Sequence, residues 1–267
     1  MNIAIIGYGK MGKLIESRAL ERGHRITGVV EPYTADKAAL SGTVICKTIA
    51  EGGNLGGADV AIEFTGPNTA VSNIMSLAER KIPLVVGTTG WYDRLEEVKR
   101  AVEAAGSSLL WASNFSLGVN LFYRIAEYAA KLINPFPEYD AGGWEIHHSK
   151  KADSPSGTAK TLVERVLAGF TRKQTPVWDM LNRPPAAEEL HYPSLRVGSM
   201  PGIHRLIFDS PADTIEIIHT ARNREGLASG ALAAAEWLLS CSGPGRPVGE
   251  AHRGVFTIDD VLQDGGV

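Results

Sequence analysis

The segment Met1-Asn-Ile-Ala-Ile-Ile-Gly7-Tyr-Gly9-Lys-Met-Gly12 decides the fold class. Its apolar run, residues 2–6, has the pattern of a buried strand, and the glycine motif G-x-G-x-x-G follows that strand directly. A helical pattern over residues 10–21 begins inside the motif. Glycines in this position permit a tight turn and let the N–H groups of a helix N-terminus approach a pyrophosphate. The segment therefore predicts the first β-α unit of a Rossmann-type domain that binds a dinucleotide.

The rest of the first half repeats this alternation of strand and helix. Short β-branched runs and helical patterns recur at a spacing of roughly 25 residues, which is typical of a doubly wound parallel sheet. The expected strands are residues 2–6, 25–30, 59–64, 83–86 and 108–111. The expected helices are residues 10–21, 69–79 and 94–105, and the glycine-rich residues 51–57 are expected to form a loop.

A different pattern begins near Ser116 and predicts a second lobe that mixes helices and strands. The expected elements are a helix over 117–133, a loop over 134–143, a strand over 144–148, a helix over 158–170, a long loop over 171–195, a hairpin of 203–208 with 214–219, and a helix over 227–239. The last helix is expected to return to the first lobe.

The composition excludes several classes of protein. The chain has 267 residues, of which 44% are hydrophobic and 21% charged, and this balance predicts a soluble globular protein. Its longest weakly polar stretch, residues 228–241, has about fourteen residues, fewer than the ~20 needed to cross a bilayer. The amino terminus lacks the basic region and the cleavage site of a signal peptide. We therefore expect a cytoplasmic protein with no membrane span.

Cysteine usage and net charge narrow the choice of partner. Cys46 and Cys241 lie far apart and have no C-x-x-C spacing, which excludes a disulfide framework and a thiolate zinc site. With 27 Lys+Arg against 30 Asp+Glu, the net charge is −3, and the sequence has no basic patch for nucleic acid. The expected partner is a small molecule.

The residues around Glu31 bear on the choice of dinucleotide. Glu31 ends the second expected strand, where an acidic side chain can accept hydrogen bonds from the adenosine ribose. Pro32 follows it and supplies no cation for a 2′-phosphate, so the sequence favours NADH, or dual use of NADH and NADPH. Lys10 is either a second candidate for a 2′-phosphate or an ordinary solvated lysine at the start of a helix.

Two further segments follow expected strands. Gly87-Thr88-Thr89-Gly90 comes after the strand ending at residue 86, and Ser113-Asn114-Phe115 comes after the strand ending at residue 111. Ligands bind at the carboxyl ends of the strands in such sheets, so both segments are candidate cofactor contacts, with Asn114 and Phe115 near a nicotinamide. A plain turn and a hinge are the alternative interpretations of the two segments.

The richest chemical pattern is Glu145-Ile-His147-His148-Ser-Lys-Lys151-Ala-Asp153-Ser-Pro155-Ser156-Gly157-Thr158. Strand alternation places Glu145 and His147 on one face and His148 on the other. His147 is therefore the candidate proton donor, and His148 is a core residue or a substrate contact. Ser156 and Thr158 begin a helix, where they can cap it and can also help to hold an anion next to the charge of Lys151. No third ligand lies at metal spacing, so no metal is expected.

On these residues the chain resembles the dihydrodipicolinate reductases, also called 4-hydroxy-tetrahydrodipicolinate reductases, a family of bacterial lysine and diaminopimelate synthesis. The resemblance rests on the glycine motif with its Lys-Met-Gly ending, on Gly87-Thr-Thr-Gly90, on Ser113-Asn-Phe-Ser-Leu-Gly-Val-Asn120, and above all on E-x-H-H-x-x-K-x-D-x-P-S-G-T-A from Glu145 to Ala159. Gly198-x-x-x-Gly202-x-His204 and Phe256-Thr-Ile-Asp-Asp260 also look like the family.

The resemblance implies an organisation and a reaction. Residues 1–115 and 225–267 would form a dinucleotide-binding domain, and residues 116–224 a substrate-binding and oligomerisation domain whose open mixed sheet forms a homotetramer. In the family, a nicotinamide hydride reduces the cyclic dicarboxylate 4-hydroxy-tetrahydrodipicolinate to tetrahydrodipicolinate, with loss of the 4-hydroxyl group.

The resemblance also implies roles for single residues. His147 would donate the proton, and Lys151 would be its partner at the substrate. The expected substrate contacts are His148, Ser156, Gly157, Thr158 and Thr89. The expected cofactor contacts are Gly7, Gly9, Lys10, Met11, Gly12, Glu31, Gly87, Thr88, Thr89, Ser113, Asn114, Phe115 and Arg224, the last near the hinge between the domains.

Two positions depart from the family pattern, and three other functions fit the sequence less well. Members often have a glutamate where this chain has Gly143, and a basic residue where it has Pro32; the second departure weakens the case for NADPH. A related dehydrogenase acting on an amino acid would not need the Pro155-Ser-Gly-Thr158 string. A semialdehyde dehydrogenase needs a nucleophilic cysteine that neither cysteine supplies. A dinucleotide-binding regulator would have no use for a proton donor beside an anion site.

Overall fold

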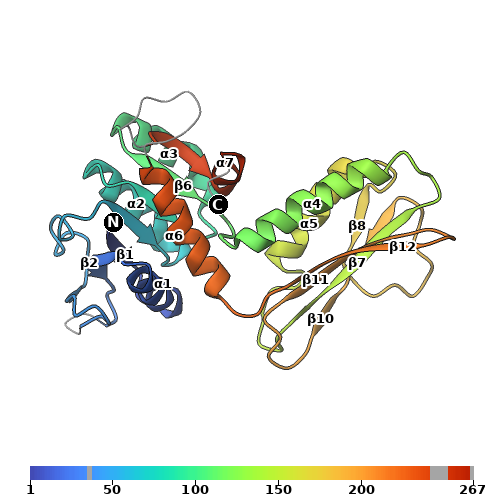
Figure 1. Cartoon of the computed structure of the whole chain (residues 1–267), viewed down its shortest axis with the longest axis horizontal. Coiled ribbons are helices and arrows are strands. Elements are labelled where there is room, and N and C mark those ends of the chain that lie inside the picture. Colours follow the sequence, from blue (N-terminus) through green and yellow to red (C-terminus); the bar gives the residue numbers. More distant parts are fainter. Residues whose placement is uncertain (35–37, 241–251, 265–267) are drawn as a thin grey trace. The chain divides into compact units, whose positions relative to one another are not determined.

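The chain forms two compact units in the computed structural model, which describes residues 1–34, 38–240 and 252–264 (Figure 1). Unit 1 comprises Met1–Ser116 with Leu227–Val267, and unit 2 comprises Leu117–Gly226. Of the two cysteines, Cys46 is a free thiol, and Cys241 lies outside the described residues. Over the described ranges, none of the helices has both the length and the apolar character required to span a bilayer.

Unit 1 is built on a parallel sheet of seven strands in the order β13-β6-β5-β4-β1-β2-β3. The strands are β1 (Asn2–Ile6), β2 (Arg25–Val30), β3 (Ile45–Cys46), β4 (Val60–Glu63), β5 (Leu84–Val86), β6 (Ser108–Trp111) and β13 (Gly254–Thr257). The helices are α1 (Lys10–Glu21), α2 (Pro67–Glu79), the 3-10 turn η1 (Tyr92–Arg94), α3 (Leu95–Ala104), α6 (Glu225–Leu239), which enters this unit at Leu227, and α7 (Ile258–Gln263).

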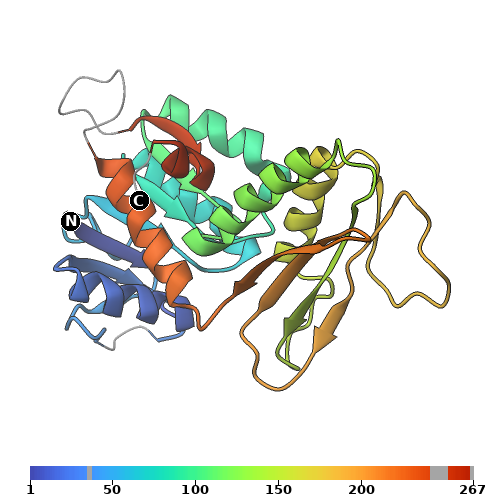
Figure 2. The ribbon, with the colours of Figure 1, turned by 45° about the vertical axis from the view of Figure 1, so that its right-hand side comes forward.

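The sheet of unit 1 is covered by helices on both faces, as Figures 1 and 2 show. Alternate residues of β1 explain this arrangement, because successive side chains of a strand point to opposite faces. Ala4 and Ile6 are buried in the same core cluster as the apolar residues of α2 and α3. A Cβ on Gly12 in α1 would lie only 3.2 Å from the side chain of Ile5, so α1 packs on the other face. The predicted doubly wound Rossmann-type sheet is confirmed.

The turn between β1 and α1 needs glycine at two positions. Gly7 has φ +93°, and a Cβ there would lie 2.1 Å from the carbonyl oxygen of Phe64. A Cβ on Gly12 would lie 2.2 Å from the carbonyl oxygen of Gly7. Both contacts are shorter than any side chain tolerates, so the glycines allow α1 to pack directly on the turn.

Unit 2 contains a mixed four-stranded sheet in the order β10-β7-β11-β12, with β10 and β7 parallel and the other pairs antiparallel. Its elements are α4 (Leu117–Ile133), β7 (Asp140–His147), α5 (Gly157–Gly169), β8 (Thr175–Val177), β9 (Glu189–His191), β10 (Ser194–Arg196), β11 (Ile203–Asp209) and β12 (Thr214–Thr220), with β8 and β9 forming a separate parallel pair. Figure 2 shows α4 and α5 side by side against one face of the sheet. The predicted second domain with a mixed sheet is confirmed.

Three sequence-based expectations for these elements were wrong. The loop expected over 134–143 ends early, because β7 begins at Asp140 and pairs along its length with β11. The long loop expected over 171–195 contains the short strands β8 and β9, which pair with each other, and the start of β10, whose partner β7 is distant in the chain. The strand β13 and the helix α7 were not expected, although Thr257 and Asp260 form a capping box at the start of α7.

Gly143 explains why β7 does not look like a strand in the sequence. A Cβ at this position would lie 2.2 Å from the carbonyl oxygen of Arg205 and 2.6 Å from the ring of Tyr192, which is fully buried. The aromatic ring occupies the space that a side chain at position 143 would need. This packing gives a physical reason for the glycine where members of the resembled family often have a glutamate.

Candidate active site

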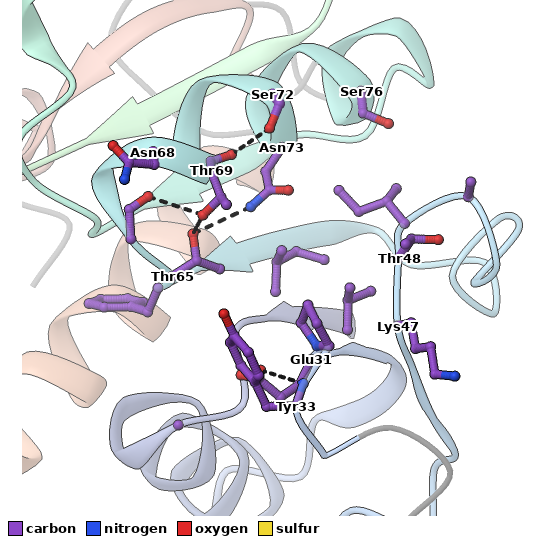
Figure 3. A pocket seen from close by; sticks show the side chains of 18 of the residues that line it. Glu31, Tyr33, Lys47, Thr48, Thr65, Asn68, Thr69, Ser72, Asn73 and Ser76 are labelled. Carbon is purple, nitrogen blue, oxygen red and sulfur yellow. Dashed lines mark hydrogen bonds between the residues drawn. The ribbon is translucent and has the colours of Figure 1, made fainter.

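A cavity of about 770 Å³ lies at the carboxyl ends of β1, β2 and β4 in unit 1 (Figure 3). This is the edge of a parallel sheet at which ligands bind in Rossmann-type folds. Two of the predicted cofactor contacts, Gly9 and Glu31, line the cavity. The other lining residues are Ile6, Val30, Pro32, Tyr33, Lys47, Thr48, Ile49, Ala50, Phe64, Thr65, Gly66, Pro67, Asn68, Thr69, Ser72, Asn73 and Ser76.

The carboxylate of Glu31 is held beside the glycine turn. Its Oε2 accepts a hydrogen bond from the backbone N–H of Tyr8 at 3.0 Å, and its Oε1 accepts one from the N–H of Tyr33 at 3.2 Å. The exposed side chain of Tyr33 also lines the cavity. These contacts fix an acidic group where a ribose would lie, as the sequence predicts for this position.

Gly9 leaves space for a phosphate at the start of α1. It is the N-cap residue of this helix, no side chain caps the helix start, and a Cβ on Gly9 would have no atom within 4 Å. The first N–H groups of a helix lack partners within the helix and attract anions. This open turn, with Glu31 beside it and a large cavity next to it, fits a dinucleotide.

Gly87 and Thr88 do not line the cavity themselves but contact two residues that do. A Cβ on Gly87 would lie 2.2 Å from the ring of Phe64, and the buried Thr88 accepts a hydrogen bond from the N–H of Thr65 at 2.7 Å through its Oγ1. Both Phe64 and Thr65 line the cavity. Thr89, the next residue, has an exposed side chain.

The segment after β6 is mostly used for packing. Phe115 is 1% exposed and contacts the ring of Phe64, and Gly230 of α6 lies so close that a Cβ would overlap the carbonyl oxygen of Phe115. Asn114 accepts a hydrogen bond from the N–H of Ser116 at 2.8 Å. Of the remaining predicted contacts, Lys10, Ser113 and Arg224 are exposed, Met11 is half-buried, and Arg224 lies just before α6.

Sequence reasoning missed the largest part of the cavity wall, which follows β4. Thr65 and Asn73 line it and hydrogen-bond the buried carboxyl group of Glu63. Burial raises the pKa of Glu63, although the hydrogen bonds from Thr65, Thr88 and Asn73 oppose this shift. Its position in the sequence could have predicted this wall, because the segment directly follows a central strand of a parallel sheet.

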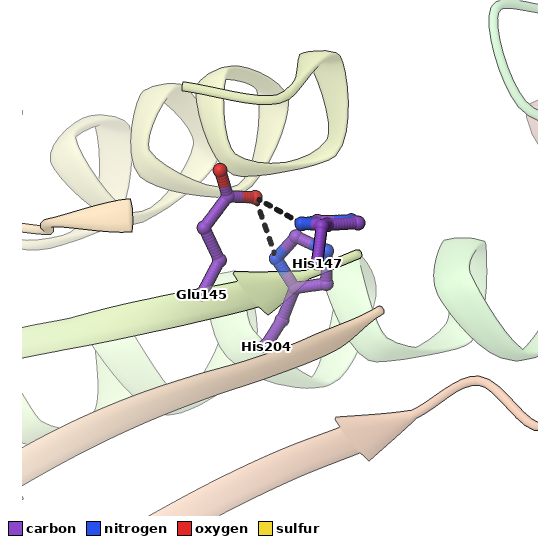
Figure 4. A group of neighbouring side chains, drawn as sticks. All are labelled: Glu145, His147 and His204. Atoms are coloured by element: carbon purple, nitrogen blue, oxygen red, sulfur yellow. Dashed lines mark ion pairs between the residues drawn. The ribbon is translucent and has the colours of Figure 1, made fainter. Parts of the chain in front are cut away.

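The second candidate site lies in unit 2 around the fully buried carboxylate of Glu145 on β7 (Figure 4). Its Oε1 accepts the backbone N–H of Ser156 at 2.9 Å and the hydroxyl of Ser194 at 2.6 Å, and its Oε2 accepts the hydroxyl of Ser156. Burial alone would raise the pKa of Glu145, but these hydrogen bonds and the nearby His147 lower it. The carboxylate therefore joins β7 to the start of α5 and to β10.

His147 lies on the same face of β7 as Glu145, as strand alternation predicts. Its Nδ1 is 3.3 Å from Oε2 of Glu145, and its side chain is 10% exposed. His204 reaches the same oxygen from β11, with its Nδ1 at 3.8 Å and its ring edge-on to that of His147 (Figure 4). Neither His204 nor Glu145 was a predicted site residue.

The environment of His147 acts on its charge in opposite directions. Burial lowers the pKa of His147, the carboxylate of Glu145 raises it, and the cations Lys151 and Arg196 lower it further. The net shift is downward, and Glu145 is the largest influence that favours the protonated ring.

The atoms of Glu145, His147 and His204 lie within 4.8 Å of one another, a spacing that a metal ion could bridge. The sequence-based argument that no third ligand is available was therefore wrong, because the hairpin brings His204 to the site. However, Glu145 already accepts three hydrogen bonds, and Arg196 lies 3.6 Å from its Oε1. These contacts describe a hydrogen-bonded carboxylate, and we assign no metal to it.

The start of α5 and Lys151 are the groups that the sequence predicts to hold an anion. Ser156 caps the helix by accepting the N–H of Ala159 at 3.0 Å. Lys151 pairs with Asp153 at 2.7 Å, and Asp153 also accepts the N–H of Gly157. Partial burial would raise the pKa of Asp153, but Lys151 and these backbone groups lower it. A carboxylate of the protein itself thus contacts the predicted substrate-binding groups.

The comparisons with known proteins cover both units. The model described as "Dihydrodipicolinate reductase, N-terminus" matches residues 1–115, and that described as "Dihydrodipicolinate reductase, C-terminus" matches residues 118–262. This chain belongs to the dihydrodipicolinate reductase family. It is therefore a nicotinamide-dependent oxidoreductase with a Rossmann-type domain.

Individual relatives of this family match over nearly the whole chain. The 4-hydroxy-tetrahydrodipicolinate reductase of Christiangramia forsetii is 35% identical over 99% of this chain and 98% of its own length, and that of Archaeoglobus fulgidus is 34% identical over 98% and 100%. The structure of a dipicolinate-bound dihydrodipicolinate reductase from Paenisporosarcina sp. TG-14 superposes with a TM-score of 0.74 at 20% identity, covering 96% of this chain and 97% of that one. The fold of this chain is thus a dihydrodipicolinate reductase fold.

The substitution Gly9→Ala tests the dinucleotide site of this family member. The added methyl group meets no protein atom, so folding should be unaffected, but it would occupy the space where a pyrophosphate approaches α1. We expect the Kd for NADH, measured by fluorescence titration, to rise about tenfold or more, with an unchanged thermal midpoint. The control is Gly142→Ala in unit 2, whose Cβ would have only one neighbour, at 3.5 Å. Equal NADH affinity in both variants would contradict the assignment.

Proposed function

We propose that this chain reduces 4-hydroxy-tetrahydrodipicolinate to tetrahydrodipicolinate with a nicotinamide dinucleotide. The relatives named 4-hydroxy-tetrahydrodipicolinate reductase match this chain over nearly their whole lengths. The observation that carries the proposal is the grouping of His147 at the end of β7 with Lys151, which acts on the charge of His147, and with the N-terminus of α5. A proton donor beside an anion site suits a dicarboxylate that must accept a proton during its reduction.

The proposed reaction needs a hydride, a binding site for the substrate carboxylate and a proton, and different groups supply each of them. The dinucleotide, when bound at Gly9 and Glu31 of unit 1, supplies the hydride. Lys151 and the N-terminus of α5 bind a substrate carboxylate, which takes the place of Asp153 at these donors. Addition of the hydride and loss of the 4-hydroxyl group as water consume one proton in total, and His147 supplies it. His148 and Thr158 are further proposed substrate contacts.

Replacement of His147 by glutamine tests the proton donor. Because glutamine is polar but cannot act as an acid, we expect kcat to fall by about 10² or more, while the affinity for NADH is unchanged. The assay uses substrate generated enzymatically in the cuvette and follows NADH absorbance. The control is His191→Gln on β9, whose ring binds the carbonyl oxygen of Asp179 and has no proposed role. Near-normal kcat in the His147 variant would exclude this residue as the acid.

The cofactor preference is a separate proposal, in favour of NADH. Glu31 holds a negative charge beside the ribose site and Pro32 adds no cation, so a 2′-phosphate would be repelled at this position. We expect a higher kcat/KM with NADH than with NADPH, or values within a fewfold of each other. A large advantage for NADPH would contradict the proposal. It would indicate that a cation binds the 2′-phosphate, and Lys47 is an exposed cation in the cavity wall (Figure 3).

We also propose that the chain assembles as a homotetramer through the open face of its four-stranded sheet. Trp144 lies on the face opposite Glu145, where the guanidinium group of Arg205 stacks on its ring at 5.2 Å. Ile218, the register partner of Arg205 on β12, is 48% exposed. An exposed apolar sheet face is typical of an assembly surface. Sedimentation velocity should give the mass of four chains, and a monomer at micromolar concentration would contradict the proposal.

A further inference from the structure

The buried carboxylate of Glu145 has one hydrogen-bond position left. A carboxylate can accept about four hydrogen bonds. Two are taken on Oε1 by the N–H of Ser156 and the hydroxyl of Ser194, and a third is taken on Oε2 by the hydroxyl of Ser156. The remaining position is on Oε2, the oxygen that faces the two imidazole rings.

Two imidazole nitrogens are available for this single position. The Nδ1 atoms of His147 and His204 lie 3.3 Å and 3.8 Å from Oε2 of Glu145. Both atoms are buried, and neither has another hydrogen-bond partner among the described residues. Burial lowers the pKa of His204, which is more enclosed than His147, so its ring favours the neutral form. The shorter distance favours His147 as the donor to Glu145.

The other nitrogen of His147 faces a different environment. Its Nε2 lies next to Gly202, where a Cβ would come within 3.0 Å, and the backbone of Gly202 has φ +146°. The absence of a side chain there keeps this edge of the ring uncovered. The two nitrogens are thus distinguished by their surroundings, with Nδ1 facing a carboxylate and Nε2 facing a glycine.

We propose that Glu145 is a positioning residue that holds the Nδ1–H of His147, so that Nε2 is the atom that gives the proton to the substrate. This inference rests on the proposed role of His147 as the acid. A carboxylate in this position fixes the tautomer of the neutral ring and stabilises the imidazolium form. Through Ser156, the same carboxylate also sets the position of α5, whose first N–H groups are part of the proposed anion site.

Charged groups from every surrounding element act on His147. They are Glu145 on its own strand, Lys151 and Asp153 on the following loop, Arg196 on β10, His204 on β11 and, beyond His204, His219 on β12. Among these, only Glu145 and Asp153 favour the protonated ring, and Glu145 is the larger influence. Removing the charge of Glu145 should therefore make His147 lose its proton at a lower pH.

The main test is Glu145→Gln, which keeps the size of the side chain and one acceptor oxygen. The reaction needs protonated His147, so kcat falls as pH rises through the pKa of this group. Without the carboxylate, we expect this fall to occur at least about one pH unit lower, with an unchanged Kd for NADH. The matched control is Glu127→Gln on α4, which removes a carboxylate of the same unit that pairs with Lys131 at 2.6 Å and should leave the pH of the fall unmoved. An unmoved profile in the glutamine variant would overturn the proposal.

A second test needs no variant of Glu145 to fold. Histidine labelled with ¹⁵N in the wild-type chain reports which ring nitrogen carries the proton, and the His147→Gln variant assigns the signal. We expect neutral His147 to carry its proton on Nδ1. A proton on Nε2 would overturn the positioning role. Normal turnover by His147→Gln would instead overturn the proposed acid while leaving the tautomer result intact, so the two failures are distinguishable.

The same preparation addresses the metal alternative. Purified wild-type chain, dialysed against zinc and then against buffer, should retain no stoichiometric zinc, and EDTA should leave kcat unchanged. One zinc per chain that is lost in Glu145→Gln would show that the cluster of Glu145, His147 and His204 is a metal site, and would overturn the proposed hydrogen bond.

Discussion

The burial of the Glu145 carboxylate is the constraint on which the second unit depends. A charge removed from water is costly unless hydrogen bonds and opposite charges surround it. Glu145 meets this requirement with hydrogen-bond donors from the start of α5 and from β10, and with the guanidinium group of Arg196 and the imidazoles of β7 and β11 close by. Each of these elements must therefore approach β7 closely. The spacing from Glu145 to Ser156 in the sequence reflects this one requirement, because the chain must turn back so that the helix start reaches the carboxylate.

The same constraint shows what could and could not be predicted from the sequence. The β1-Gly-α1 turn was predictable, because a strand, three glycines and a helix are adjacent in the chain and their geometry is local. Strand alternation likewise placed Glu145 and His147 on one face. Their partners were not predictable, because Ser194 and His204 arrive through strand pairings that no local pattern encodes. For the same reason the sequence predicted too short a strand for β7. Gly143 is typical of a loop, and only the fold shows that the ring of Tyr192 occupies the space of its missing side chain.

The pairing of Lys151 with Asp153 is compatible with the proposed binding of substrate at Lys151. The side chain of Asp153 is 58% exposed and that of Lys151 is 21% exposed, so water screens their attraction. Exposed ion pairs of this kind contribute about 0–1 kcal/mol. A dicarboxylate that reaches Lys151 and the N–H groups of α5 can replace Asp153 at little cost. Meanwhile, the pair keeps the lysine and the helix start from being left without an anion in the free chain.

Two buried glutamates in this chain show how the surroundings decide the charge of one residue type. Burial disfavours the charged form of both Glu63 and Glu145. Glu145 is nevertheless held as a carboxylate by a backbone N–H, two hydroxyls and nearby cationic groups, whereas Glu63 has a backbone N–H, hydroxyls and an amide, which only partly offset its burial. The difference suits their positions. A shift of Glu63 towards its neutral form reduces negative charge behind a wall that would face the phosphates of a dinucleotide. In the proposed reaction, a charged Glu145 would support an imidazolium that gives up its proton.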